Sequence, residues 1–420
     1  MGLSNTLVDL GPLRTSPAFR RLWIGRSFSE FGGQMALLAV MYQVWQTTGS
    51  TVWTGAVGMA RAIPLVALGL FAGSVTDRSD RRKVYLITTT GQATCSVLLA
   101  VQGLLGRLPV PGVLSLVAAQ ACFGAGGAPA FRTFIPRLLP APQVAAGLAL
   151  NRITFQAAML VGPAIGGLIL GWRGVGLCYL IDAVTFVFAF YGAFGLPTMR
   201  PEGEPARPGL HGVVDGVSFL LRHPAVRGAL LTDLATTVLS FPISLFPLIN
   251  AERFDNDPRT LGLFLTVIAA GGVIASIFSG AFTRSTRPGA VMLVGSAVWG
   301  AALALFGVAP NPWLGLSFLL LAGAADTISV VSRSTIVQLH TPDELRGRVA
   351  AAEQIVGQAG PDVGNMRGGL VADVTSGRAA LVSGGLLCVA AVALIGLRTP
   401  DLRRFSTPNV VASGLIRVSD

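Results

Sequence analysis

Ionisable side chains interrupt the long apolar stretches of this sequence, where a charge is costly to bury. Charges in such positions pair with one another, carry protons or contact a ligand. Arg132, Arg333 and Glu353 fall near the ends of their stretches, so we expect them to cap a helix or to reach water. Asp182 and Asp373 fall near the opposite ends and could be solvated there. The others are Arg26, Glu30, Arg61, Arg152, Asp233, Asp326, Asp362 and Arg367.

Glu30 and Asp233 are the candidates for taking up and releasing a proton. Asp233 occupies the same place in a repeated segment as Arg26, so the two are expected to face one central axis from opposite halves. Glu30 lies one helical turn from Arg26 and can pair with it. A guanidinium opposes protonation of a neighbouring carboxylate and burial favours it, so a motion that separates the pair would move a proton. The alternative is a permanent salt bridge that only balances charge.

Four arginines, Arg26, Arg61, Arg152 and Arg367, are expected to bind an anionic or catechol-bearing molecule. Guanidinium groups pair with acidic oxygens and stack on aromatic rings. Phe28 and Phe155 could add apolar walls to such a site, although aromatic rings on these stretches more often face lipid or packed neighbours.

The composition of the chain indicates that these apolar stretches lie in a lipid bilayer. The chain has 420 residues, of which 52% are hydrophobic and 12% charged, with a mean hydropathy of +0.66. Soluble domains carry about 25% charged residues. The 52 glycines and 25 prolines are spread through the apolar stretches, as membrane helices tolerate. The composition therefore argues against three classes of protein: a soluble enzyme, a disordered chain and a secreted disulfide scaffold.

Twelve apolar segments are long enough to cross a bilayer. The loops on one side of the membrane contain 20 basic residues, and those on the other side contain five, Arg107, Arg173, Arg253, Arg259 and Arg378. Because the basic side is cytoplasmic, both termini are expected in the cytoplasm. The membrane topology explains the positive charge, so we expect no nucleic-acid partner. The predicted spans are 20–46, 53–76, 84–106, 112–134, 143–170, 174–196, 225–250, 259–282, 289–309, 312–334, 347–375 and 379–397.

An internal repeat divides the chain into two halves. Pro17 recurs as Pro224 at an offset of 207 residues, and the Gly166-Gly167 pair recurs at an offset of 202. A parallel duplication of six helices is typical of transporters. The predicted organisation is a six-helix bundle over 1–196, a cytoplasmic linker over 197–223, a second six-helix bundle over 224–397 and a cytoplasmic tail over 398–420.

The loop after the second span resembles the signature of the major facilitator superfamily. Gly73 is followed four residues later by Asp77, and then by a basic cluster that includes Arg78 and Arg81. The glycine allows close helix approach and the aspartate can face the positive N-terminal end of another helix. Asp80 stands where the family usually has glycine. The resemblance implies that these residues form a conformational gate.

A second motif resembles an element of exporters in that superfamily. The fifth span contains Gly162, Pro163, Gly166 and Gly167 in the pattern GPxxGG. Small residues permit tight helix packing and the proline bends the helix, so these residues are also expected to act in the gate.

A narrower resemblance covers nearly the whole chain. The segments LRTSPAFR (13–20), DRSDRRKV (77–84), STRPG (285–289) and TPDELRGR (341–348) are similar to those of the enterobactin exporter group. The resemblance implies an exporter of a catecholate siderophore. We expect a monomer in the bacterial cytoplasmic membrane that exchanges the siderophore for protons by alternating access. The alternative is a multidrug exporter of lipophilic cations or neutral antibiotics.

No enzyme motif accompanies these features. The sequence lacks HExxH, GxxxxGK[ST] and CxxC patterns, and its three histidines fall in loops or at helix ends. The four cysteines have no metal-ligand spacing. We therefore expect no catalysis, no cofactor and no metal. We expect an ion gradient to supply the energy for active transport.

Overall fold

The computed structural model describes residues 9–76, 78–106, 108–199, 218, 220–283, 285–342 and 346–405, and all regular structure in them is helical. The first part of the chain forms α1 (Gly11–Thr15), α2 (Pro17–Thr48), α3 (Thr51–Thr76), α4 (Arg81–Leu105), α5 (Val110–Leu138), η2 (Ala141–Gln143), α6 (Val144–Arg173) and α7 (Val175–Phe194). The second part forms α9 (Pro224–Ser240), η3 (Ile243–Leu245), α10 (Phe246–Arg253), α11 (Pro258–Ile277), α12 (Gly280–Thr283), α13 (Pro288–Val308), α14 (Pro312–His340), α15 (Arg346–Val374), α16 (Gly377–Arg398) and α17 (Pro400–Arg403).

Ten helical segments of the described chain are long and apolar enough to cross a membrane. The two other predicted spans coincide with α2 and α15, which have 32 and 29 residues. Both exceed the length of about 20 residues that a bilayer requires. Their buried or half-buried charges make them less apolar than the rest. The predicted all-helical membrane fold is confirmed, and the helices are consistent with twelve spans.

Local sequence explains where these helices begin and end. Ser16, Asn311 and Ser376 each accept a hydrogen bond from the backbone N–H three residues later, the usual contact of an N-terminal cap. Gly49 and Gly106 end α2 and α4 in the left-handed conformation, which favours glycine.

The seventh and eighth predicted spans are found over Pro224–Arg253 and Pro258–Ile277, and the structure adds a break to each. The seventh is divided into α9 and α10, because Pro242 has no N–H to continue the helix after Ser240. The eighth ends as α11 at Ile277 and resumes only as the short α12.

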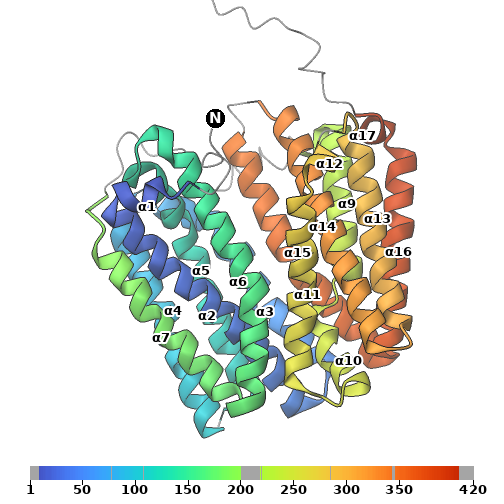
Figure 1. Ribbon diagram of the computed structural model, residues 1–420, viewed down its shortest axis with the longest axis horizontal. Coiled ribbons are helices and arrows are strands. Elements are labelled where there is room, and N and C mark those ends of the chain that lie inside the picture. The colour runs from blue at the N-terminus through green and yellow to red at the C-terminus, as the bar shows by residue number, and fades with distance from the viewer. Residues whose placement is uncertain are drawn as a thin grey trace, which may run out of the picture.

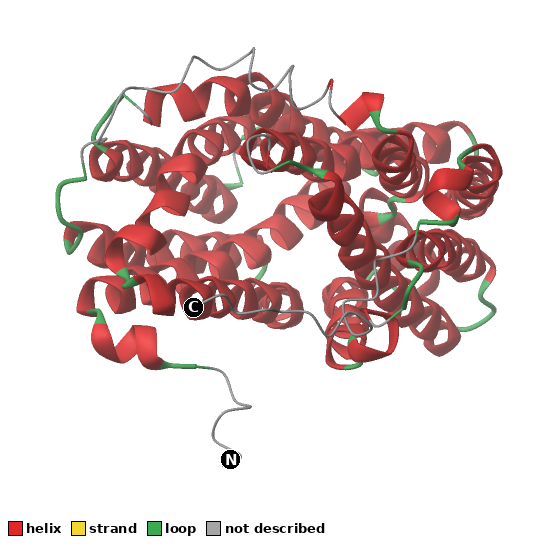
Figure 2. Cartoon of the chain, turned by 90° about the horizontal axis from the view of Figure 1, so that it is seen from above, coloured by secondary structure: helices red, strands yellow, loops and turns green. Residues whose placement is uncertain are grey.

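The helices form two groups that lie side by side (Figure 1). The N-terminal group is α2–α7, with a core around Leu99, Val113 and Tyr179. The C-terminal group is α9–α16, with a core around Phe264, Trp299 and Leu381. The groups converge at the end where α10 lies and diverge at the end where α17 lies; Figure 2 shows them from above. The predicted boundaries at residues 196 and 224 stay a prediction, since residues 200–217 and 219 lie outside the described chain.

Glycines bring the two groups into contact at two places. Between α3 and α15, a Cβ placed at Gly369 would lie 3.5 Å from Cα of Gly55 and would collide with the carbonyl oxygen of Thr51. Between α6 and α11, a Cβ placed at Gly167 would lie 3.2 Å from Cα of Gly262 and 2.9 Å from the carbonyl oxygen of Pro258. Gly55 and Gly262 are 207 residues apart, and Gly167 and Gly369 are 202 apart. The repeat in the sequence is therefore also a repeat in the contacts.

Candidate transport site

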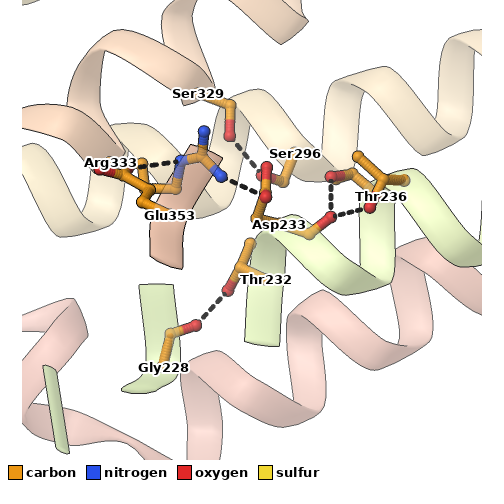
Figure 3. Close-up of polar contacts among 9 residues, drawn as sticks. Gly228, Thr232, Asp233, Thr236, Ser296, Ser329, Arg333 and Glu353 are labelled. Atoms are coloured by element: carbon orange, nitrogen blue, oxygen red, sulfur yellow. Dashed lines mark hydrogen bonds and ion pairs between the residues drawn. The ribbon is translucent and has the colours of Figure 1, made fainter. Parts of the chain in front are cut away.

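A buried ionic cluster joins three helices of the C-terminal group (Figure 3). Arg333 of α14 contacts the Asp233 carboxylate of α9, and its Nε lies 3.4 Å from Oε1 of Glu353 on α15. The side chains of Arg333 and Asp233 are each 9% exposed, and that of Glu353 is 17% exposed. We call these residues the Arg333 triad. Arg333 and Glu353 were expected to cap or to reach water, and that expectation is wrong because both pair inside the bundle.

Polar neighbours surround the triad without neutralising it. Ser296 and Ser329 share a hydrogen bond of 2.7 Å beside it, and Thr236 and Thr237 donate to the backbone carbonyl of Asp233 (Figure 3). Asp326, two turns before Arg333 on α14, lies within electrostatic range of Asp233 and Arg333. All of these neighbours are uncharged or negative.

Arg26 does not pair with Asp233. It forms the expected ion pair with Glu30 on its own helix, and its guanidinium lies 4.8 Å from the centre of the Phe131 ring of α5. The side chain of Arg26 remains 41% exposed. The expectation from the repeat that Arg26 and Asp233 face one central axis stays a prediction; in this structure Arg26 pairs with Glu30, and Asp233 pairs with Arg333.

Arg61 joins the two helix groups. Its Nη1 on α3 lies 3.8 Å from Oδ1 of Asp362 on α15, with the arginine side chain 45% exposed and the aspartate buried. A Cβ placed at Gly58 would lie 2.7 Å from the carbonyl oxygen of Asp362, so the backbones are also close. The pair lies about two helical turns from the Gly55–Gly369 contact, where the groups touch.

The remaining predicted ligand-binding residues have separate surroundings. Arg152 is exposed on α6 and lies 5.9 Å from the ring centre of Phe155. Phe28 of α2 stacks on Phe188 of α7 at 4.2 Å between ring centres. Arg367 donates to the carbonyl of Leu239 at the end of α9, a contact in which a cation stabilises a helix C-terminus. The structure therefore brings no two of the four predicted arginines into contact.

Asp182 is almost fully buried, so the expectation that it is solvated is wrong. Ser96 of α4 donates to its carboxylate at 2.6 Å, and Gln120 of α5 donates to Ser96 at 2.8 Å. The network ties α4, α5 and α7 together.

The basic loop before α4 is docked on the N-terminal group. Asp80 caps α4, accepting from the backbone N–H of Arg82 at 2.9 Å and from that of Met199 at 3.3 Å. Arg82 donates to the carbonyl of Phe194 at the end of α7. Asp80, which stands where the family usually has glycine, thus has a structural role as the N-terminal cap of α4. Its position directly before the predicted start of a helix could have indicated this role.

The other residues of the predicted gate have these positions. Gly73 is in α3, Arg78 is exposed in the turn and Arg81 begins α4, whereas Asp77 lies outside the described residues. Gly162 and Gly166 face α2, since a Cβ placed at Gly162 would lie 2.7 Å from Cβ of Gln34. Gly167 and the carbonyl of Pro163 face Gly262 of α11. The GPxxGG segment therefore packs α6 against both helix groups.

Sequence similarity extends over the whole chain. The model of the family described as transmembrane secretion effector matches residues 8–414. The chain is 29% identical to the enterobactin exporter EntS of Escherichia coli O6:K15:H31, over 99% of this chain and 100% of that protein. It is also 29% identical to the enterobactin exporter EntS of Shigella boydii serotype 18, over 98% and 100%.

Solved transporters share the fold. The nucleoside transporter NupG has a TM-score of 0.68 at 14% identity, covering 93% of this chain and all of that one. A bacterial homologue of the iron transporter ferroportin in an inward-facing state has a TM-score of 0.67 at 15% identity, covering 92% and 99%. These similar proteins are transporters rather than enzymes, which supports a multi-pass membrane transporter of a small molecule. The chain belongs to the transmembrane secretion effector family of the major facilitator superfamily.

Proposed function

We propose that this protein exports a catecholate siderophore, or a similar amphipathic molecule, from the bacterial cytoplasm in exchange for protons. The observation that carries the proposal is the similarity to enterobactin exporters over the full length of both chains. The geometry supports it, because the half-exposed guanidinium of Arg26 already lies over an aromatic ring, the contact that a catechol would make.

The cargo-binding residues of this proposal are Arg26, Arg61 and Arg152, with Phe28 and Phe155 as apolar neighbours. The three arginine side chains are exposed or half-exposed on α2, α3 and α6 of the N-terminal group. Arg367, also predicted to bind cargo, contributes by holding the end of α9, since one of its nitrogens is bound to Leu239. Glu30 and Asp233 are the proton-coupling carboxylates, each beside a guanidinium that competes with protonation.

Alternating access would use the two glycine contacts. Thr51 and Pro258, at the predicted outer ends of α3 and α11, both lie against the opposite helix group. Contact at the outer ends, with the groups diverging at the end where α17 lies, supports an inward-facing state (Figure 1). Both termini are then cytoplasmic in a monomeric chain embedded in the inner-membrane lipid, and the halves 1–196 and 224–397 move relative to each other.

Asp77 is proposed to favour the opposite, outward-facing state. Docked at the start of α15 near residues 346–349, its carboxylate would gain about 0.3 to 1 kcal/mol from the helix-end amides. Asp77→Asn should therefore shift the population inward by roughly two- to fivefold and slow export. Accessibility labelling in intact cells measures the shift, with Asp373→Asn as the control; unchanged populations would remove Asp77 from the gate.

A multidrug exporter is the second candidate, favoured by one observation. Arg26, Arg61 and Arg333 all have carboxylate partners within the described chain, so these arginines repel a cationic drug less than free guanidinium groups would. In that case Glu30 and Asp233 would bind the cation.

Comparison of strains with and without the gene tests the cargo. Under iron limitation, the deletion strain should retain catecholate siderophore in the cells and release less to the medium, and the plasmid-borne gene should restore release. Under antibiotic challenge, the two strains should grow alike. Normal siderophore release together with increased antibiotic sensitivity would replace the proposal with the multidrug function.

A further inference from the structure

The charges of the Arg333 triad do not balance. Two carboxylates, Asp233 and Glu353, face one guanidinium in a region where all three side chains are buried or nearly so. With both carboxylates ionised the triad would hold a net negative charge, and Asp326 would add a second. An uncompensated charge is strongly unfavourable in a low-dielectric interior, and a carboxylate becomes neutral there by binding a proton.

No other described cation completes the balance. The helices that pack against α9 include α13, which has no charged residue, and α16, whose charges Arg378 and Arg398 lie at its two ends. They also include α17, whose charges Asp401 and Arg403 are exposed. On α15, Asp362 pairs with Arg61, and Arg367 is bound to the carbonyl of Leu239. Within the described residues, the atoms that form these ion pairs have no hydrogen-bond partner: Oδ2 of Asp233, Nε and Nη1 of Arg333, and Oε1 of Glu353.

We propose that Asp233 and Glu353 share one proton across Arg333, and that this pair is the proton site of the C-terminal half. With the proton on Glu353, the Arg333 guanidinium pairs with the Asp233 carboxylate, as in this structure, where Arg333 is closer to Asp233 than to Glu353. When the proton moves from the Glu353 carboxyl to the Asp233 carboxylate, the guanidinium pairs with Glu353 instead. One O–H bond breaks and one forms, and the net charge is unchanged.

The depths of the carboxylates give the transfer a direction. At 1.5 Å per residue, Glu353 lies about 10 Å from the start of α15, Asp233 about 14 Å from the start of α9, and Asp326 about 21 Å from the end of α14. These three helix ends lie together, joined by a cluster that includes Val226, Val337 and Val349. The proton on Glu353 is therefore nearest the predicted cytoplasmic end, and Asp233 leads toward the interior.

This inference rests on the proposed proton exchange for its use in transport, but its test requires no cargo. The full chain is purified in lipid nanodiscs, and infrared spectroscopy at pH 7 measures the carbonyl stretch of protonated carboxyl groups. Asp233→Asn and Glu353→Gln should each lower the band by one carboxyl, because one carboxylate then remains for one guanidinium. Arg333→Gln should raise it by one, because two carboxylates then lack a cation, and Arg333→Lys should restore it.

Asp373→Asn, an exposed carboxylate on the same helix as Glu353, should leave the band unchanged. The opposite signs expected for the carboxylate and arginine variants distinguish a proton site from misfolding, and each protein must also elute as a single species. A band unchanged in both carboxylate variants would overturn the proposal. Loss in only one of them would overturn the sharing and assign the proton to that residue. A proton found here with no siderophore export would reject the cargo and keep the site.

Discussion

At the scale of single residues, the structure separates two kinds of ion pair. Arg26 and Glu30 pair within one helix, whereas Asp233, Arg333 and Glu353 pair between three helices. A pair within a helix can persist through a rigid motion of that helix. A cluster between helices changes whenever those helices move, which suits it to coupling.

Neutralising the proposed coupling carboxylates should uncouple transport from the gradient. Glu30→Gln and Asp233→Asn remove the titrating group and leave a similar shape, so proton-driven export should fall by at least tenfold while exchange of labelled for unlabelled cargo continues in part. Proteoliposomes with and without an imposed pH gradient measure both activities. Full gradient-driven transport in both variants would remove these residues from the scheme.

Asp80→Ala should destabilise the N-terminal group. The substitution removes the cap of α4 and the contact with the Met199 backbone, and loss of such a cap costs about 1 kcal/mol. Thermal unfolding of the purified chain should show a lower midpoint for Asp80→Ala, with Asp80→Asn close to wild type because the amide oxygen can still accept. Equal midpoints for the alanine and asparagine variants would contradict a capping role.

At the scale of helices, glycine determines how closely the two groups approach. The Cβ of Gly369→Ala would collide with Thr51 on α3, and that of Gly262→Ala would collide with Pro163 on α6. Neither neighbour can move aside easily, because in both cases it is backbone.

Both variants should therefore oppose closure at the outer ends. We expect the fraction of molecules labelled from outside to increase at least twofold for Gly369→Ala and for Gly262→Ala. Gly69→Ala on α3 is the matched control, since nothing lies within 4 Å of its added Cβ. Labelling of either variant at the wild-type or Gly69→Ala level would show that the contact is not part of the gate.

At the scale of the whole molecule, the Arg61–Asp362 pair is a polar link between the two groups. At 3.8 Å, with Arg61 45% exposed, the pair is partly screened by solvent and should contribute about 0.2 to 1 kcal/mol. Arg61→Gln and Asp362→Asn should each shift the inward-facing population by up to roughly fivefold.

A double-mutant cycle distinguishes the interaction between Arg61 and Asp362 from the individual effect of each side chain. If the pair acts as a unit, the double variant should resemble either single variant in its accessibility to labelling. Additive effects would mean that Arg61 and Asp362 act independently. Arg61 would then act only in cargo binding.

The sequence by itself determined the membrane class, the positions of the helices and the repeat. Apolar runs of about 20 residues, charge at their ends and proline or glycine at their borders are local features, and a bilayer requires helices wherever such runs occur. Of the two breaks that local reasoning missed, the one between α9 and α10 follows from Pro242, whose effect within an apolar run depends on the polar partners available to the freed carbonyls.

Only the tertiary structure decided which charges meet. Each residue turns a side chain by 100° about the helix axis, so a small rotation of α14 or α15 would place Arg333 against lipid or against Asp233. Equivalent positions in the repeat did not give Arg26 and Asp233 a shared partner. Pairing between helices depends on their rotation and distance, which packing of the whole bundle sets and which spacing along one helix does not contain.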